Sequence, residues 1–145
     1  MIIKSFETEK IKSKKNNLIL LYGKNQGYKN QVINEIFEGE TSRYEENEIL
    51  SNYENFISNL MNKSLFDDEK LIIISRASEK ILNFVNEIIE RKIDKVRIII
   101  NSDSLEKKSK LRNLFEKENE LICIPFYEDN EKSLRIIAQN FFNQK

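Results

Sequence analysis

Short apolar runs alternate along this chain with segments whose apolar residues recur at helical spacing. Four of the runs are continuous and rich in Ile and Leu, which is typical of strands buried on both faces of a sheet. These predicted strands cover residues 18–22, 71–74, 96–100 and 121–124. A weaker fifth strand is expected at Thr41–Glu45, with Tyr44 as its apolar residue. Pro125 is expected to end the last strand, because proline has no N–H to donate to a neighbouring strand.

Between these runs, apolar residues spaced three and four apart predict amphipathic helices. Ser78 is a candidate N-cap, Gly39 a candidate C-cap, and a short surface helix is expected within residues 4–15. The predicted apolar faces are Val32, Ile33, Ile36 and Phe37; Leu50, Tyr53, Ile57, Leu60 and Met61; Ile81, Leu82, Val85, Ile88 and Ile89; Leu111, Leu114 and Phe115 within a helix at 105–118; and Leu134, Ile137, Ala138, Phe141 and Phe142.

Strands that alternate with helices predict an α/β fold with a parallel five-stranded sheet and helices on both faces. The length of 145 residues fits a single domain that spans residues 1–145. Phe141 and Phe142 leave little sequence after them to cover them, which suggests that the natural protein continues beyond Lys145.

Composition narrows the possible chemistry. The chain has 24 Lys and Arg against 24 Asp and Glu, so no excess charge directs it to nucleic acid or to a membrane. Cys123 is the single cysteine and there is no histidine, which excludes disulfides, Cys/His catalysis and the usual zinc sites. We expect no catalytic residue, metal or cofactor. Without a signal peptide or an apolar run of membrane length, we expect a cytoplasmic protein without membrane contact.

Gly23 follows the first strand directly, in the position where a phosphate-binding loop begins. The pattern G-x-x-x-x-G-K-[ST] then requires glycine at 28, lysine at 29 and a hydroxyl residue at 30. The chain has Tyr28, Lys29 and Asn30 instead, so only the lysine is in place. Gly27 lies one position early, and a shifted loop could still hold an anion. Two interpretations stay open here: a divergent nucleotide site, and an ordinary turn between a strand and a helix.

The acidic residues that a P-loop ATPase needs after a buried strand are also missing. Ser75 and Arg76 follow the strand at 71–74, while Asp67 and Asp68 precede it. Asn101 follows the next strand, where it could touch a phosphate or form a turn. These deficits predict that the chain does not hydrolyse a nucleotide.

A pair of adjacent apolar residues, Leu65 and Phe66, ends the helix before the strand at 71–74. Neighbours about 100° apart on a helix cannot both point at the centre of the core. One interpretation is that they close the rim of the core. The other is that they form a plug for a pocket on a partner, worth about 1.5–3 kcal/mol per buried side chain.

Basic residues gather at 107–112, with Lys107, Lys108 and Lys110 among them. Glu106 and Glu116 dilute their charge, so direct DNA contact by this domain alone is not expected.

Four stretches in this order resemble the N-terminal domain of the bacterial DNA polymerase III delta subunit, the clamp-opening member of the replicative clamp loader. They are Leu-Tyr-Gly at 21–23, Lys-Ser-Leu-Phe at 63–66, Lys-Lys-Ser-Lys-Leu-Arg at 107–112 and Cys-Ile-Pro-Phe-Tyr-Glu at 123–128. The resemblance implies an AAA+-like, P-loop NTPase-like fold without a working nucleotide site, the degenerate loop being Gly23, Gly27, Lys29 and Asn30.

The same resemblance implies a function and partners. The domain would bind the beta sliding clamp through Leu65 and Phe66, with Ser64 beside them, and open the ring for loading on DNA. Other clamp-loader subunits would be its partners, and DNA would be met only through the assembled complex. This domain would not be catalytic itself, although the polymerase III holoenzyme to which it belongs is a nucleotidyltransferase. The lid and collar domains of the family are absent from this chain. The alternative is a divergent P-loop nucleotide-binding protein.

Overall fold

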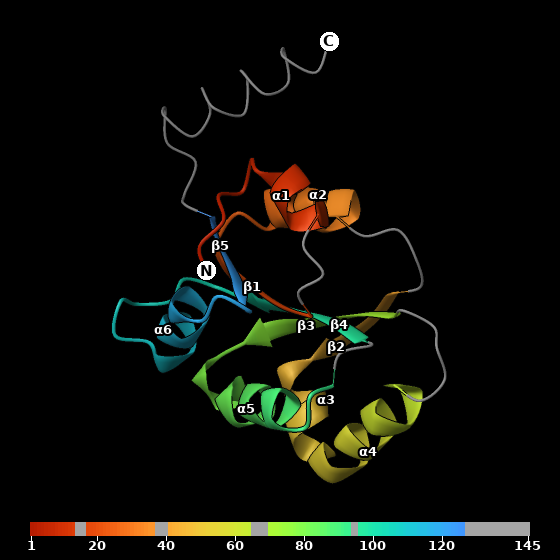
Figure 1. The fold of residues 1–145 in the computed structure, drawn as a ribbon. Helices are drawn as coiled ribbons and strands as arrows, with labels where there is room; N and C mark the ends of the chain where they lie inside the picture. The colour runs from red at the N-terminus through yellow and green to blue at the C-terminus, as the bar shows by residue number, and fades with distance from the viewer. Residues whose placement is uncertain (14–16, 37–40, 65–69, 94–95, 127–145) are drawn as a thin grey trace.

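Five parallel strands form one sheet in the order β2-β3-β4-β1-β5 (Figure 1). The computed structural model describes residues 1–13, 17–36, 41–64, 70–93 and 96–126. The strands are β1 Leu18–Gly23, β2 Thr41–Glu45, β3 Lys70–Ala77, β4 Val96–Ser102 and β5 Ile122–Phe126. The prediction of a parallel five-stranded sheet in an α/β fold is confirmed.

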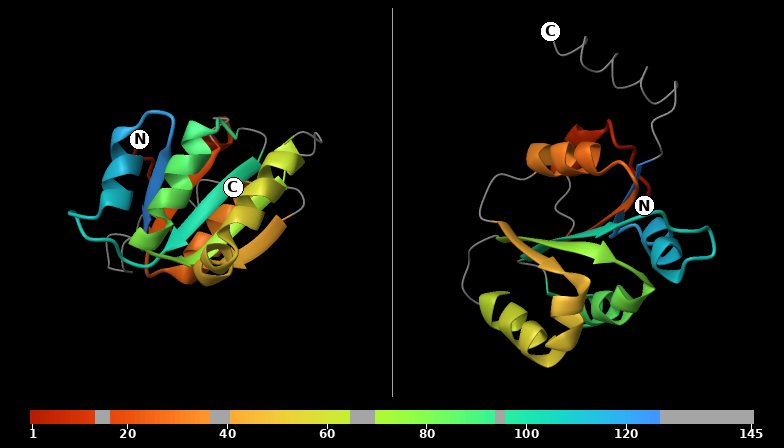
Figure 2. Two further views of the ribbon diagram at one scale, coloured as in Figure 1. Left: turned by 90° about the horizontal axis from the view of Figure 1, so that it is seen from below. Right: turned by 180° about the vertical axis from the view of Figure 1, so that it is seen from behind.

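Helices cover both faces of this sheet (Figures 1 and 2). On one face lie α1 (Thr8–Ser13) and α2 (Gln26–Ile36). On the other face lie α3 (Glu46–Ser51), α4 (Tyr53–Ser64), α5 (Leu82–Glu90) and α6 (Lys110–Lys117). A short 3₁₀ turn, η1 (Glu79–Ile81), leads into α5, and Ser78 caps it by accepting a hydrogen bond from the N–H of Lys80.

The sheet separates two apolar cores because successive side chains of a strand point to opposite faces. In β1, Leu18 and Leu20 join the core under α3 to α6, whereas Ile19 and Leu21 join the core under α1 and α2. All six residues of β1 are buried, as expected for a central strand between two helical layers.

The strands that follow β1 in the sequence lie on both sides of it in the sheet. The crossover through α2 leads from β1 to β2 at the far edge, and the later crossovers proceed back across the other face until β5 lies beside β1. The helices after β1 and β4 therefore lie on opposite faces of two neighbouring strands. In doubly wound sheets this arrangement opens a crevice at the carboxyl ends of the two strands.

Several helix boundaries differ from the predictions. The helix expected around residues 50–61 is two helices, α3 and α4, which are separated at Asn52 by a non-helical backbone conformation (φ −136°, ψ 41°). The helix expected from residue 105 starts only at Lys110. Met61 and Ile89, both predicted to face the core, keep 39% and 41% of their surface exposed.

The prediction that Pro125 ends the last strand is wrong. Pro125 lies inside β5 and pairs in register with Tyr22 of β1. The N–H of Cys123 donates to the carbonyl of Met1 and therefore points away from β1. Backbone nitrogens two residues apart in a strand point the same way. The nitrogen of Pro125 thus faces away from β1, and no hydrogen bond of the sheet is lost.

Several predictions concern residues outside the described ranges. These are the apolar position Phe37, the C-cap Gly39, the apolar pair Leu65 and Phe66, the acidic pair Asp67 and Asp68, and the last helix around residues 134–142.

Candidate functional site

The turn after β1 lies at the carboxyl ends of the neighbouring strands β1 and β4 and depends on Gly23. Its φ is +121°, a conformation that residues with a side chain rarely adopt. A Cβ at this position would lie 1.7 Å from the carbonyl oxygen of Phe126. The N–H of Gly23 donates to the carbonyl of Asp103 over 3.2 Å. Close packing against the ends of β4 and β5 therefore explains this glycine without any ligand.

Only Lys24 and Asn25 separate β1 from α2, and Asn25 acts as the N-cap of the helix. Its side-chain oxygen accepts the N–H of Tyr28 at 3.2 Å, and its carbonyl accepts the N–H of Lys29 at 3.0 Å. The N–H of Gln26 donates to the carbonyl of Lys24. Backbone donors of the first helical turn, which wrap around a phosphate in a P-loop, are thus used inside the turn.

Lys29 is fully buried and braces α2 against the end of β4. Its ammonium donates to Oδ1 of Asn101 at 2.9 Å and to the carbonyl of Ser102 at 2.7 Å. Burial lowers the pKa of Lys29, and the negative charge of Asp103 partly opposes this effect. The ammonium of Lys29, the one residue in place for the expected phosphate loop, therefore has protein oxygens as its hydrogen-bond acceptors.

The other residues of the expected phosphate loop do not lie beside the ammonium of Lys29. Asn30 is exposed on the surface of α2 and accepts a hydrogen bond from Gln26. Gly27 is exposed, and an added Cβ there would meet nothing within 4 Å. The ring of Tyr28 stands edge-on to Phe126, with centroids 5.4 Å apart. The structure brings Lys29 and Asn101 together, but it does not bring Gly27 and Asn30 to them.

The carboxyl end of β3 carries a cation where an ATPase would hold acidic groups. Arg76 has a positive φ of 55° and lies where the pairing of β3 with β4 shifts register. Its exposed guanidinium approaches a carboxylate oxygen of Glu45 at 3.8 Å. An exposed pair of this kind contributes little to stability.

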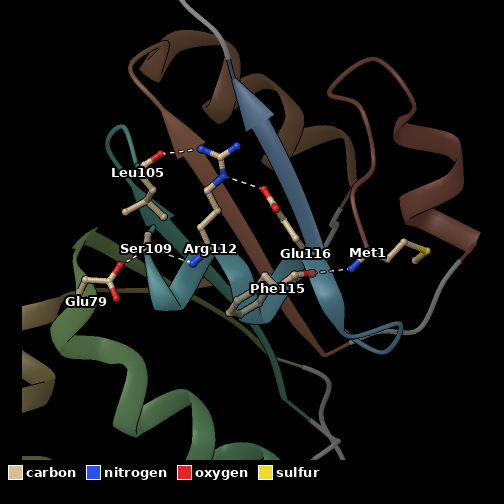
Figure 3. Close-up of polar contacts among 7 residues, drawn as sticks. All are labelled: Met1, Glu79, Leu105, Ser109, Arg112, Phe115 and Glu116. Carbon is tan, nitrogen blue, oxygen red and sulfur yellow. Dashed lines mark hydrogen bonds and ion pairs between the residues drawn. The ribbon is translucent and has the colours of Figure 1, made fainter. Parts of the chain in front are cut away.

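Two glutamates that sequence patterns did not single out form hydrogen bonds between separate elements near the carboxyl end of β3. Buried Glu46 accepts hydrogen bonds from the N–H and the hydroxyl of Ser78. Glu79 accepts a hydrogen bond from the hydroxyl of Ser109 (Figure 3). It accepts another from the N–H of Leu111 at the start of α6. Each partner is about 30 residues away, so no local motif signals these contacts.

Lys108 and Lys110 of the basic stretch at 107–112 line a cleft of about 570 Å³ between η1 and the start of α6. Lys108 and Lys110 are exposed there, and Lys108 lies 3.5 Å from Glu106. Arg112 instead faces inward (Figure 3). It donates to Glu116 at 2.7 Å and to the carbonyl of Leu105 at 2.9 Å, and it stacks 5.0 Å from the ring of Tyr22. The hydrogen bond to Glu116 raises the pKa of Arg112. Arg112 is therefore committed to contacts within the fold.

The helix that precedes the apolar pair is part of the described chain. Helix α4 ends at Ser64 and β3 begins at Lys70, so Leu65 and Phe66 follow the helix directly. Met61, one turn before the pair, is exposed, and its sulfur accepts a hydrogen bond from Arg91 at 3.0 Å. The pair itself lies outside the described residues.

Within the described ranges, no helix is long and apolar enough to cross a membrane. The same residues contain no group of three carboxylate, thiol or imidazole side chains that could hold a metal ion.

The chain was compared with models of known protein families and with curated proteins. The family suggested by the sequence motifs remains a prediction. No family model matches the chain, and no curated protein matches it.

Proposed function

We propose that this chain is a clamp-binding domain like that of the DNA polymerase III delta subunit. It binds a ring-shaped beta sliding clamp through Leu65 and Phe66 and opens the ring as one subunit of a clamp loader. Its fold is AAA+-like, and it neither binds nor hydrolyses a nucleotide. Other subunits of the complex supply the ATP chemistry, and DNA is reached only through the assembly.

The observation that carries this proposal is the place of the pair relative to α4. Ile57 and Leu60 already fill the core face of this helix and are buried. Two further large apolar residues follow directly after its last residue, Ser64. Large apolar residues beyond those that α4 needs for its core contacts are candidates for contact with a partner.

The geometry of Lys29 supports a role without nucleotide. A lysine that reaches phosphates must have its ammonium free to do so, and this ammonium is buried on Asn101 and Ser102. Doubly wound proteins bind phosphates at the carboxyl ends of two such neighbouring strands, which is compatible with descent from a nucleotide-binding fold. The alternative, a divergent nucleotide-binding protein, requires these hydrogen bonds to break before a phosphate can bind.

The test is the affinity for the cognate clamp, measured by calorimetry. Each side chain of the pair contributes about 1.5–3 kcal/mol when buried, so Leu65→Ala with Phe66→Ala should weaken binding at least 100-fold. Ile89→Ala is the matched control, because Ile89 is an exposed apolar residue on a different helix. It should bind as tightly as the original chain.

Two outcomes contradict the proposal. Binding that survives the double substitution would remove the pair from the interface. A double variant that is unfolded by circular dichroism would place the pair in the core. The alternative has its own test: a thermal shift with Mg²⁺ and ATP that disappears in Lys29→Ala would favour nucleotide binding, and we expect no shift in either protein.

A further inference from the structure

Helices α4 and α5, which lie on the same face of the sheet (Figure 1), are joined by a connected series of side-chain hydrogen bonds. The hydroxyl of Tyr53, the first residue of α4, donates to Oε2 of Glu87 on α5. Oε1 of Glu87 accepts a hydrogen bond from Arg91 at 3.3 Å. Arg91 donates in turn to the sulfur of Met61 at 3.0 Å. This interhelix network of four residues therefore begins at the start of α4 and returns to the same helix in its last turn.

The aromatic contacts between the two helices lie in the first half of α4. The ring of Phe84 on α5 has its centroid 6.3 Å from that of Tyr53 and 5.7 Å from that of Phe56. Met61 lies farther along α4 and keeps 39% of its surface exposed. The hydrogen bond from Arg91 is thus a contact by which α5 reaches the last turn of α4.

The charges of the network favour the contacts that it makes. A glutamate four residues before an arginine on one helix is the favourable order for such a pair, as in Glu87 and Arg91. Arg91 is also the C-cap residue of α5, where the partial negative charge of the helix end attracts a cation. Burial raises the pKa of Tyr53, and so does its hydrogen bond to Glu87. The hydroxyl therefore stays protonated at neutral pH and remains a donor.

We propose that Glu87 and Arg91 are positioning residues for clamp binding, because they fix the last turn of α4, which directly precedes the apolar pair. The inference rests on the proposed function. Binding is tighter when the element that carries the contact residues is already held in place, since less conformational entropy is lost in the complex. Loss of the interhelix network should therefore weaken clamp binding although neither residue belongs to the pair.

The test compares Glu87→Ala with Glu90→Ala. The first substitution removes the acceptor of Tyr53 and the partner of Arg91 together. The second makes the same chemical change at an exposed position of α5 and is the matched control. Hydrogen exchange of residues 56–64 reports on the end of α4, and calorimetry gives the affinity for the cognate clamp. In Glu87→Ala we expect exchange to be about fivefold faster or more and the clamp Kd to rise about threefold or more. Glu90→Ala should stay within about twofold in both.

Ser78→Ala controls for a general loss of stability. It removes a hydroxyl that donates to Glu46 after the carboxyl end of β3, whereas α4 ends before the amino end of that strand. This variant should unfold at lower urea and bind the clamp within about twofold of the original chain. If Glu87→Ala does not fold, Arg91→Met takes its place with the same expected changes, because it removes the guanidinium and keeps the hydrogen bond between Tyr53 and Glu87.

Three outcomes overturn the inference alone. Unchanged exchange in residues 56–64 would show that the network does not fix the end of α4. Unchanged clamp affinity in Glu87→Ala, beside lost affinity in Leu65→Ala with Phe66→Ala, would remove the positioning role and leave the proposed function standing. An equal loss of affinity in Ser78→Ala would reduce the effect to general destabilisation. Binding that survives the double substitution of the pair defeats the proposed function itself, and the inference falls with it.

Discussion

Replacing Lys29 by methionine removes the buried ammonium and keeps most of the aliphatic stem. Oδ1 of Asn101 and the carbonyl of Ser102 then lose their shared donor. An unpaired buried acceptor costs about 1–3 kcal/mol. Part of this loss is offset, because methionine does not have to be desolvated as an ammonium does. We expect a net loss of about 1–3 kcal/mol in the free energy of unfolding, an effect that urea denaturation resolves readily.

Lys24→Met is the matched control for this substitution. Lys24 belongs to the same turn but is exposed, so its replacement should change stability by no more than about 0.5 kcal/mol. The reasoning is refuted if Lys29→Met is as stable as the original chain. That result would mean that the ammonium contributes nothing to the fold, as expected for a lysine reserved for a ligand.

The pH dependence of the same pair of proteins gives an independent check. Burial lowers the pKa of Lys29 below its ordinary value of 10.5, so above the lowered pKa the unfolded chain binds more protons at this residue than the folded one. Stability then rises with pH between the lowered pKa and 10.5. The stability of the original chain relative to Lys29→Met should therefore increase as the pH is raised from neutral toward 10.

Four further predictions use other parts of the structure. Gly23→Ala should destabilise the domain by more than about 3 kcal/mol in urea, because its Cβ meets a backbone carbonyl at 1.7 Å. Gly27→Ala should instead stabilise it by about 0.5–1 kcal/mol, and a loss there would argue for a phosphate loop. In a double-mutant cycle, Glu46→Gln and Ser78→Ala should be coupled by about 1 kcal/mol or more, and additive effects would show that their hydrogen bonds do not contribute. Burial raises the pKa of Cys123 to about 12, so its thiol should react with a disulfide reagent at pH 8 only after unfolding; rapid reaction of the native chain would contradict its burial.

The strands could be located from the sequence because each buried run is itself the signal. A run such as the one at 71–74 has no polar position to expose, so it can lie only between two helical layers. The order of the strands could not be obtained in this way. It depends on pairings such as β1 with β4 and β5, which link residues about 80 and 100 positions apart.

The candidate site was predictable in position but not in detail. The strand, glycine turn and helix around Gly23 were predicted in the order that the structure shows. The partners of Lys29 are 72 and 73 residues away, so the sequence could not show that its ammonium is held by Asn101 and Ser102. The break at Asn52 was equally hidden, because the apolar spacing of α4 continues backwards to Leu50.

The orientation of Pro125 has a consequence for self-association. Edge strands with free N–H groups are templates on which other chains add strands and aggregate. Along the outer side of β5, Cys123 already donates to Met1, and the next position on that side is Pro125, which has no hydrogen to give. A foreign strand that approached this border would find no donor at either residue. Pro125 therefore disfavours the addition of a strand from another molecule at this edge. The pairing of β5 with β1 stays intact.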